Sequence, residues 1–271
     1  MKPITEKEFS QLVYFIRTEY GINLFHKKAL VVGRLQNYIM QSGFKSFSEY
    51  YESVLADKTG NAASVLINKM TTNHTFFMRE SEHFDYLQRG VLPRLEFEDI
   101  IKKDLRIWSA GCSTGEEAYT LAMIIDEYFG EDKGFLDTKI LATDISTRVL
   151  ETAVGGIYSR EEIASLPDKW KRNYFTQVNE ENSMIIDRIK NEVIFKRFNL
   201  MEKVFPFQRK FHIIFCRNVM IYFDQKTKNE LADKFYESME RGGHLFIGHS
   251  ESLNREETKF KYVKPAIYRK D

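Results

Sequence analysis

The stretch SAGCSTGEEAY, residues 109–119, decides how this chain of 271 residues is interpreted. It continues the apolar run LRIW at 105–108 and leads into a helical pattern, so it predicts a strand, a glycine turn and a helix. Open α/β sheets bind their ligands at such turns. Two glutamates, Glu116 and Glu117, stand in the first turn of the predicted helix and restrict what that ligand is.

The same residues fit the G-x-S-x-G pattern of a hydrolase nucleophile elbow. That fold needs an acid and then a histidine further along the chain, and Asp144 and His249 occur in this order. It also places several strands before the serine, whereas the sequence before Trp108 is predicted to be helical. We therefore disfavour the hydrolase.

Phosphate-binding motifs fail on spacing and on charge. The glycines occur as Gly111-x-x-x-Gly115 instead of G-x-G-x-x-G, and no Lys-Ser/Thr pair follows them as in a P-loop. Carboxylates in the first turn of the helix would also repel a phosphate. The turn therefore predicts a nucleotide-like ligand without phosphates and with positive charge. S-adenosylmethionine, which carries an ammonium and a sulfonium, meets both conditions.

Structural interpretations of the same acids remain open. Ser113-x-x-Glu116 and Thr114-x-x-Glu117 both fit a capping box, in which case the glutamates stabilise only the helix. Asp144 ends the next predicted strand, KILATD (139–144), where an acid can accept the two hydroxyls of a ribose. Its alternative role is the N-cap of the helix that begins near Ser146.

Strand and helix patterns alternate through the second part of the chain and predict a doubly wound α/β sheet. FHIIFC (211–216) and HLFIGH (244–249) are further strands, and YVKPAIYR (262–269) is expected as one edge strand because it contains Pro265. The polar stretch before Val193 breaks the alternation, and MIIDRIKNEVIF (184–195) suggests a small antiparallel β-subdomain, placed at about 165–193.

Residues 1–90 are predicted to form an all-helical domain, and residues 91–271 the α/β domain. Thr5-x-x-Glu8 is a capping box, apolar residues follow it at helical spacing, and Gly21 is a C-cap signal. Three more helical patterns occur before residue 71. No strand pattern interrupts them.

Composition excludes several functional classes. The 40 basic and 39 acidic residues balance to +1, which gives no footprint for nucleic-acid binding. The two cysteines and six histidines show no metal-ligand spacing. No signal peptide is visible, and no apolar run approaches the ~20 residues of a membrane span. We expect a cytoplasmic monomer without a metal and without insertion into a membrane.

Several long motifs occur in the order found in one known family. They are TTNHTFFMRE (71–80), WSAGCSTGEEAY (108–119), ATDIS (142–146), FNL (198–200), IFCRNVMIYFD (214–224) and GGHLFIGHSE (242–251). The chain resembles the CheR family, the chemoreceptor glutamate methyltransferases of bacterial chemotaxis. The resemblance implies a class I methyltransferase domain after the helical domain. It also implies methyl transfer from S-adenosylmethionine to receptor glutamates, with a methyl ester and S-adenosylhomocysteine as products.

The resemblance also implies roles for single residues. The cofactor contacts that it implies are Asn73, Thr75, Arg79, Glu116, Glu117, Asp144, Asn199, Leu200, Arg217 and Asn218. Arg79 and Tyr222 are the pair implied to be catalytic. An arginine holds a carboxylate in a two-pronged fork that lysine cannot copy, so Arg79 suits either the substrate carboxylate or that of the cofactor. Tyr222 would orient the nucleophile, and its alternative is a core aromatic.

The partner implied by the resemblance is the cytoplasmic, acidic methylation region of a chemoreceptor, which would bring the protein to membrane receptor arrays. Lys27, Lys28 and Arg34 lie in a segment without acidic residues and are expected to dock it. Some family members grip a receptor C-terminal pentapeptide with a glycine-containing loop. The corresponding loop here, TQVNEENS (176–183), has no glycine and looks shortened, so no such tether is expected.

Two other functions remain as alternatives. A non-catalytic member of the same family would bind S-adenosylmethionine as a sensor or scaffold. A nucleic-acid methyltransferase would share the cofactor fold, but amino-methylating types carry an N/D-P-P-Y motif where this chain has RNVMIY (217–222).

Overall fold

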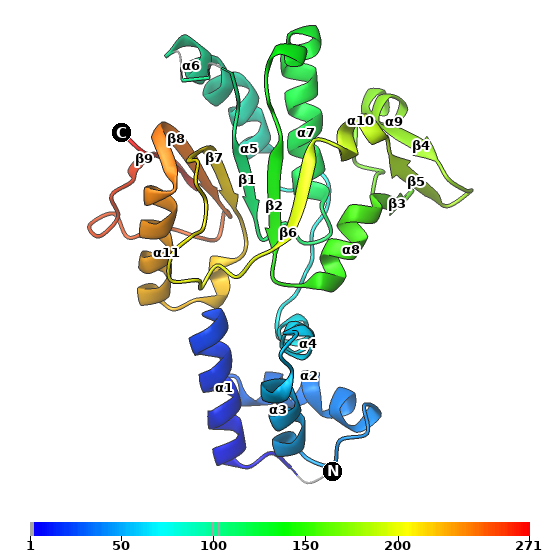
Figure 1. Ribbon diagram of the computed structural model, residues 1–271, viewed down its shortest axis with the longest axis vertical. Helices are drawn as coiled ribbons and strands as arrows, with labels where there is room; N and C mark the ends of the chain where they lie inside the picture. Colours follow the sequence, from blue (N-terminus) through cyan, green and yellow to red (C-terminus); the bar gives the residue numbers. More distant parts are fainter. Residues whose placement is uncertain (1–2, 99, 102) are drawn as a thin grey trace.

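The computed structural model describes residues 3–98, 100–101 and 103–271. The chain forms two bodies stacked along the long axis of the molecule, a helical domain and a larger α/β domain (Figure 1). Among the described residues, no helix is both long enough and apolar enough to cross a membrane.

The N-terminal domain is all helical, as predicted. Its helices are α1 (Glu6–Tyr20), α2 (Lys28–Gln41), α3 (Phe47–Ala56) and α4 (Asn61–Met70). The predicted capping box forms at the start of α1, where Thr5 Oγ1 accepts the Glu8 N–H and the Glu8 carboxylate accepts the Thr5 N–H. Gly21 ends α1 in the left-handed conformation (φ 73°), which glycine adopts without strain.

The basic side chains of the second helix differ in what they contact. Lys27 is exposed, and Lys28 Nζ lies 2.7 Å from Glu6 Oε1. Arg34 turns inward and donates to backbone carbonyls at the end of α4, with Nη1 2.7 Å from Met70 O. The expectation that Arg34 is a free docking charge is therefore corrected, because the carbonyls at the end of a helix have no partner within the helix and attract a cation.

The α/β domain is built on a seven-stranded sheet in the order β6-β2-β1-β7-β8-β10-β9. The strands are β1 (Ile107–Ala110), β2 (Ile140–Asp144), β6 (Val193–Arg197), β7 (Phe211–Cys216), β8 (Met239–Ile247), β9 (Lys261–Lys264) and β10 (Ile267–Arg269). The first five are parallel, and β10 and β9 are antiparallel to their neighbours. The strand order reverses at β1, which places the ligand-binding crevice at the carboxyl ends of β1 and its neighbours.

Helices cover both faces of this sheet, as the doubly wound prediction requires. They are α5 (Ser81–Tyr86), the π-helical turn η1 (Leu87–Val91), α6 (Leu92–Phe97), α7 (Glu116–Phe129), the 3₁₀ turn η2 (Gly130–Phe135), α8 (Thr147–Gly155), the 3₁₀ turn η3 (Met220–Tyr222) and α11 (Gln225–Glu237). Alternate strand residues enter different cores. Trp108 packs with Phe235 of α11, whereas its neighbour Ile107 belongs to the core beneath α7.

Two strand predictions need correction. Residues 193–195, which the sequence suggested for the β-subdomain, belong to β6 and pair in parallel with β2. The predicted single edge strand at 262–269 is a hairpin of β9 and β10, because the chain turns at Pro265 and Ala266, with Ala266 at φ 61°. Both errors concern pairing between strands, which local patterns do not encode.

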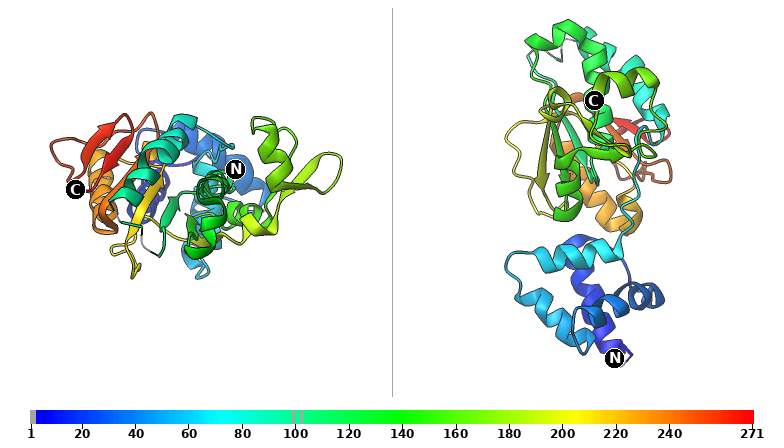
Figure 2. Two further views of the ribbon diagram at one scale, coloured as in Figure 1. Left: turned by 90° about the horizontal axis from the view of Figure 1, so that it is seen from above. Right: turned by 90° about the vertical axis from the view of Figure 1, so that its right-hand side faces the viewer.

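The antiparallel β-subdomain is a separate three-stranded sheet of order β3-β5-β4. Its elements are β3 (Ile157–Ser159), α9 (Asp168–Tyr174), β4 (Phe175–Gln177) and β5 (Asn182–Ile185), and the short α10 (Asp187–Lys190) leads back to the main sheet. The sheet begins before residue 165, where the sequence placed it. It projects beyond the β6 edge, opposite the β9–β10 hairpin (Figures 1 and 2).

The helical domain is attached at the carboxyl ends of the parallel strands. The Asn23 N–H donates to Tyr222 O, and Asn199 Nδ2 donates to Glu19 O. Arg17 lies 2.7 Å from Asp224, the N-cap of α11. The segment 71–80 crosses from one domain to the other along the same side, so the helical domain closes the crevice of the sheet.

We predict a pH-dependent contribution of Glu8 to stability. Hydrogen bonds from the Thr5 N–H and from Ser48 lower the pKa of Glu8 from 4.5 to about 2. Because the folded state prefers the ionised form, the stabilisation is complete above pH 4.5 and is lost as the pH falls towards 2. Glu8→Gln should lower the unfolding temperature at pH 7, and the difference from wild type should shrink below pH 4.5.

Glu52→Gln is the matched control, because Glu52 is exposed on α3 and has no hydrogen bond or ion pair in the part of the chain that the structure describes. Thermal unfolding followed by circular dichroism between pH 3 and pH 7 measures both variants. A Glu8→Gln deficit that stays constant across this range would contradict the assignment.

Candidate active site

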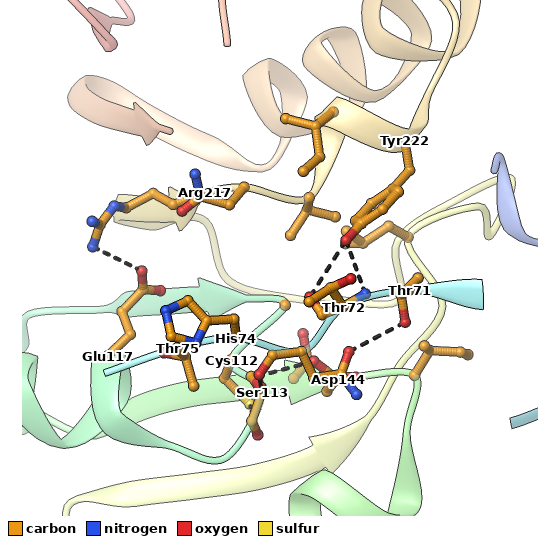
Figure 3. A pocket seen from close by; sticks show the side chains of 18 of the residues that line it. Thr71, Thr72, His74, Thr75, Cys112, Ser113, Glu117, Asp144, Arg217 and Tyr222 are labelled. Carbon is orange, nitrogen blue, oxygen red and sulfur yellow. Dashed lines mark hydrogen bonds and ion pairs between the residues drawn. The ribbon is translucent and has the colours of Figure 1, made fainter. Parts of the chain in front are cut away.

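A cavity of about 390 Å³ lies between the carboxyl ends of the parallel strands and the helical domain (Figure 3). Its wall comes from the interdomain segment, from Tyr20 and Ile22 of the helical domain, and from the loops that follow four parallel strands. These segments are 71–76 with Arg79, 111–113, 143–145, 198–200 and 217–223. A volume of this size is typical of a small-molecule site, for which the usual range is roughly 300–1,000 Å³.

The glycine turn brings backbone close to the other walls of the cavity. Gly111 has φ 89°, and a Cβ atom there would lie 2.4 Å from Val219 Cγ2. Gly115 has φ 99°, and its Cβ would lie 2.9 Å from that of Ala153. Between them, Ser113 adopts φ 48°, a strained conformation for a residue with a side chain. Both glycines are therefore required by the turn itself.

Asp144 lines the cavity at the end of β2, as predicted. Its Oδ2 accepts the Ser113 N–H at 3.0 Å, and its Oδ1 accepts the Ser146 N–H at 2.9 Å. Burial raises the pKa of Asp144, and the two backbone donors oppose this effect. The N-cap of α8 is Ser146, whose Oγ accepts the Val149 N–H, so Asp144 does not serve as the cap.

Glu117 lines the cavity and forms part of a buried ionic network. Its Oε1 accepts the Ser109 hydroxyl at 2.6 Å, and its Oε2 lies 3.1 Å from Arg217 Nη1. The second guanidinium nitrogen of Arg217 lies 3.1 Å from Glu80 Oε2 and also donates to Arg79 O. Burial raises the pKa of Glu117, while the Arg217 charge lowers it.

Glu116 does not reach the cavity. Only 2% of its surface is exposed, and its carboxylate accepts the Thr114 hydroxyl at 2.7 and 2.9 Å. Its predicted role as a cofactor contact is therefore corrected: the first helical turn points it into the protein, where burial raises its pKa. Neither predicted capping box forms, because the N-cap is Gly115, which has no side chain.

The interdomain segment supplies three predicted contacts, Asn73, Thr75 and Arg79, which all line the cavity. Asn73 O accepts the Ser113 hydroxyl at 3.1 Å and so ties the segment to the glycine turn. Arg79 Nη1 donates to His74 O at 2.6 Å. The residues on either side of Arg79 have positive φ, 60° at Met78 and 54° at Glu80.

The loops after β6 and β7 supply the remaining predicted residues. Asn199 and Leu200 line the cavity, as do Arg217, Asn218 and Tyr222. The Tyr222 ring packs against the core, while its hydroxyl accepts the Thr72 N–H at 3.1 Å (Figure 3). Tyr222 is therefore both a core aromatic, which was its alternative role, and a residue of the cavity wall, where it was predicted to lie.

Two acids that organise the site escaped prediction. Glu80 receives hydrogen bonds from Arg217 and from Asn218 Nδ2. Glu251 is buried, and its carboxylate accepts three backbone N–H groups, from Gly248 at 2.6 Å and from Asn218 and Ile221 at 3.0 Å. Glu80 ends the motif TTNHTFFMRE, and Glu251 ends the motif GGHLFIGHSE. An acid that closes such an apolar stretch is the signal in the sequence that could have identified them.

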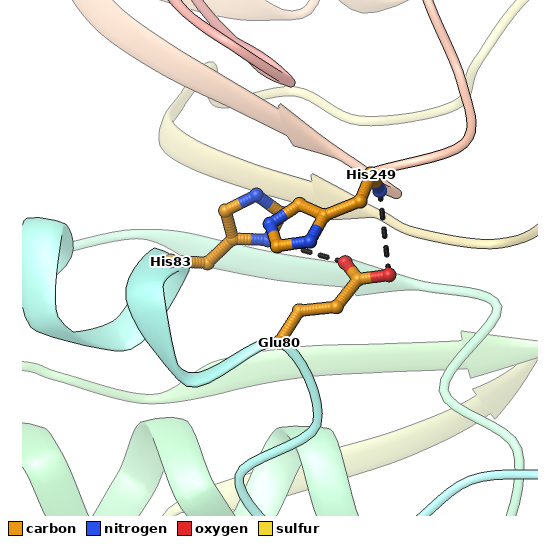
Figure 4. A group of neighbouring side chains, drawn as sticks. All are labelled: Glu80, His83 and His249. Carbon is orange, nitrogen blue, oxygen red and sulfur yellow. Dashed lines mark hydrogen bonds and ion pairs between the residues drawn. The ribbon is translucent and has the colours of Figure 1, made fainter.

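The fold brings two histidines together with Glu80, although their spacing in the sequence gave no sign of it (Figure 4). His83 Nδ1 lies 3.5 Å from Glu80 Oε2, and the rings of His83 and His249 are 4.5 Å apart. Burial, Arg217 and Lys264 contribute to a pKa of about 3 for His83, so it is neutral at pH 7. We assign no metal here, because the same cations oppose the binding of another.

The lining fits S-adenosylmethionine. Among the described residues, Asp144 forms no ion pair, so its carboxylate remains available to a ribose. The glycine turn offers backbone rather than side chains, and Ile22, Ile145 and Leu200 give the wall an apolar part. The cavity faces less negative charge than the sequence predicts, because Glu116 is turned away from it and Glu117 is paired with Arg217.

The sheet order, the glycine turn after β1 and the acid at the end of β2 are those of an α/β protein that binds a nucleotide-like cofactor at the carboxyl ends of its strands. Family models make the assignment specific. Residues 73–268 match "CheR methyltransferase, SAM binding domain", and residues 7–71 match "CheR methyltransferase, all-alpha domain". The chain belongs to the CheR methyltransferase family.

Relatives match over nearly the whole chain. It is 45% identical to the "Chemotaxis protein methyltransferase" of Borreliella burgdorferi, with 99% of this chain and 95% of that protein covered. Identity to the protein of the same name from Escherichia coli is 35%, with 97% and 89% covered. Among solved structures, the glycopeptide N-methyltransferase MtfA complexed with sinefungin is similar at a TM-score of 0.32 and 14% identity, over 58% of this chain and 49% of the MtfA chain.

We predict that Arg217→Met destabilises the protein strongly. The substitution leaves Glu80 and Glu117 as unpaired, largely buried charges, which typically costs about 3–5 kcal/mol. Arg209→Met is the control, because that arginine pairs with Asp104 while its side chain is 62% exposed. Asp104 keeps Arg106 as a second partner in that variant, so losing the exposed Arg209 should cost only about 0–1 kcal/mol. Urea unfolding measures both, and equal small effects would contradict the role of Arg217.

Proposed function

We propose that this chain transfers the methyl group of S-adenosylmethionine to glutamate side chains in the cytoplasmic domain of chemoreceptors and forms methyl esters. The names of the relatives support the chemotaxis context. The observation that carries the proposal is that Arg79, Tyr222 and Asp144 line one cavity between the domains. On this proposal the protein acts as a monomer at membrane receptor arrays.

The described residues suit binding of the cofactor. Asp144 would accept the ribose hydroxyls, and Asn199 and Leu200 would border the adenine. The glycine turn would offer the ligand backbone without side chains. The protein itself also excludes side chains there, because they would collide with Val219 and Ala153. Glu117 would face the amino-acid end of the ligand, with its own charge partly balanced by Arg217.

The reaction needs few special groups. When bound, S-adenosylmethionine supplies a methyl group on a sulfonium, which is a good leaving group. A glutamate side chain in water has a pKa of about 4.3 and is ionised at pH 7, so neither a general base nor a metal is required. The protein must align the carboxylate with the methyl carbon and exclude water, and positioning of this kind supplies roughly 7–11 kcal/mol.

Arg79 and Tyr222 would perform this alignment. Arg79 would hold either the substrate carboxylate or that of the cofactor by a two-pronged hydrogen bond. Its backbone is fixed by the pair that Arg217 forms with Glu80, the next residue. Tyr222 would direct the nucleophile through its hydroxyl, which also contacts Thr72.

The acidic methylation region of the receptor would meet the exposed start of α2. Lys27 and Lys28 lie there, with Lys28 paired to the exposed Glu6, and Arg34 does not contribute because its guanidinium is engaged by carbonyls. Recognition of this kind is electrostatic and weakens with salt.

We predict that a receptor C-terminal pentapeptide does not bind specifically. The β4–β5 hairpin turns tightly without a glycine, with the Val178 N–H 2.9 Å from Asn182 O. The Asn179 side chain fills the turn by accepting the N–H groups of Glu181 and Asn182. Fluorescence anisotropy with a labelled pentapeptide measures this, a scrambled peptide is the control, and specific tight binding would refute the prediction.

The reaction type is tested by methyl transfer from radiolabelled S-adenosylmethionine to chemoreceptor-containing membranes, followed by mild alkali. Label released as methanol identifies a carboxyl ester and supports the proposal. Alkali-stable label would mean a nitrogen or carbon acceptor and would overturn it. No label, with cofactor binding intact, would favour the non-catalytic sensor of the same family.

We predict that Arg79→Lys loses most of the turnover. Lysine keeps the charge but offers no planar fork, so the aligned geometry is lost even where the ligand still binds. A drop of roughly tenfold or more in kcat corresponds to about 1.4 kcal/mol of lost transition-state stabilisation. Initial rates with labelled cofactor measure it. Lys103→Arg, outside the cavity lining, is the control, and near-normal turnover of Arg79→Lys would eliminate the clamp.

A further inference from the structure

Arg34 contacts a segment of the cavity wall, although it lies on α2 of the helical domain. Its Nη1 donates to Met70 O at 2.7 Å and lies 3.2 Å from Thr71 O and 3.4 Å from Lys69 O. Its Nη2 lies 3.1 Å from Thr72 Oγ1. A single guanidinium thus holds the last turn of α4 and the first two residues after it.

Those two residues belong to the wall of the cofactor cavity. Thr71 and Thr72 line it, and the Tyr222 hydroxyl accepts the Thr72 N–H at 3.1 Å (Figure 3). The next residue, Asn73, accepts the Ser113 hydroxyl through its carbonyl. The interdomain segment is therefore fixed at three successive residues, by α2, by Tyr222 and by the glycine turn.

Thr71 is also held by α4, because its N–H and its hydroxyl both donate to Ile67 O, whereas the two residues after it have fewer contacts. Thr72 and Asn73 are exposed, and they lie beyond the end of α4, so no helical hydrogen bonds order them. Two further side-chain contacts reach this pair from the residues just before it, among those that the structure describes: Thr71 Oγ1 donates to Asn73 Oδ1 at 3.2 Å, and Asn73 Nδ2 donates to Asn68 Oδ1 at 3.4 Å. A lysine at position 34 would supply the charge but not a fork that spans carbonyls and a hydroxyl.

We propose that Arg34 is a positioning residue for the cofactor cavity, which holds residues 71–73 in the conformation that binds the cofactor. This inference rests on the proposed function for the identity of the ligand. The proposal gives two residues of the α2 region different roles. Lys27, at the N-cap, would contact the partner, whereas Arg34 would fix the cavity wall through Thr72, which Tyr222 also contacts. It also gives a direct connection from the proposed docking helix to the cofactor.

The test is the affinity of the full chain for S-adenosylhomocysteine by isothermal titration calorimetry, without any receptor. Arg34→Gln should raise Kd about tenfold, which corresponds to ~1.4 kcal/mol. Lys27→Gln should leave Kd unchanged and raise only the KM for receptor in the methylation assay. An Arg34→Gln variant with Kd within about twofold of wild type, and a raised receptor KM alone, would overturn the proposal and return Arg34 to docking.

A purely structural role at the end of α4 predicts a different pattern. Arg34→Lys keeps a cation at the helix end and should restore the unfolding temperature, but not the affinity. A double-mutant cycle of Arg34→Gln with Tyr222→Phe should give affinity losses that are less than additive, because both variants release Thr72. Rescue of the affinity by lysine, or strict additivity, would contradict the proposal.

Thr72→Val keeps the test decisive if Arg34→Gln does not fold. It removes the hydroxyl that Arg34 contacts and leaves α2 and α4 intact, and it should weaken S-adenosylhomocysteine binding severalfold. Unchanged affinity in this variant counts against the proposal. Failure of wild type to bind S-adenosylhomocysteine would instead overturn the cofactor assignment, and failure to methylate receptors with binding intact would overturn only the substrate.

Discussion

The site depends on the two ion pairs that the buried guanidinium of Arg217 forms. It lies between Glu80, which ends the interdomain segment, and Glu117, which begins α7, and it is itself placed by the end of β7. Without it, two carboxylates with little access to water would repel each other, so neither segment would keep its place. Arg79 precedes Glu80, and its carbonyl accepts a hydrogen bond from Arg217, so the position of the proposed clamp follows from this pair.

Several residues around the cavity have strained backbone conformations, which only contacts with the surrounding structure can maintain. Five non-glycine residues in the described part of the chain have positive φ. Four of them, Met78, Glu80, Ser113 and Asn218, lie in the segments that form or support the cavity. Each such residue typically costs about 1–3 kcal/mol and persists only where neighbouring contacts hold it. Hydrogen bonds supply that restraint: Asp144 accepts the Ser113 N–H, and Glu251 accepts the Asn218 N–H.

Sequence reasoning succeeded where a feature is local. The capping box at Thr5 and the strand that ends at Asp144 depend on neighbouring residues. The motifs that carry the family resemblance also contain most of the residues that line the cavity. It failed where a side chain chooses between neighbours that only the fold brings together. Spacing cannot tell that Glu116 turns inward to Thr114 or that Arg34 turns towards α4, and it cannot tell that residues 193–197 pair with β2.

The helical domain is not a separate attachment, because its core continues into the sheet domain. Buried residues of α1, α2 and α4 belong to the same apolar cluster as Trp108 and Phe235 on the α11 face of the sheet. Ile22 and Tyr20 from this domain line the cofactor cavity directly. A partner that moves α2 would therefore act on a surface that is continuous with the cavity wall. Since Arg34 links α2 to Thr72 by hydrogen bonds, the proposed docking of a receptor on α2 would be coupled to cofactor binding, and linkage requires that any effect of one on the other be mutual.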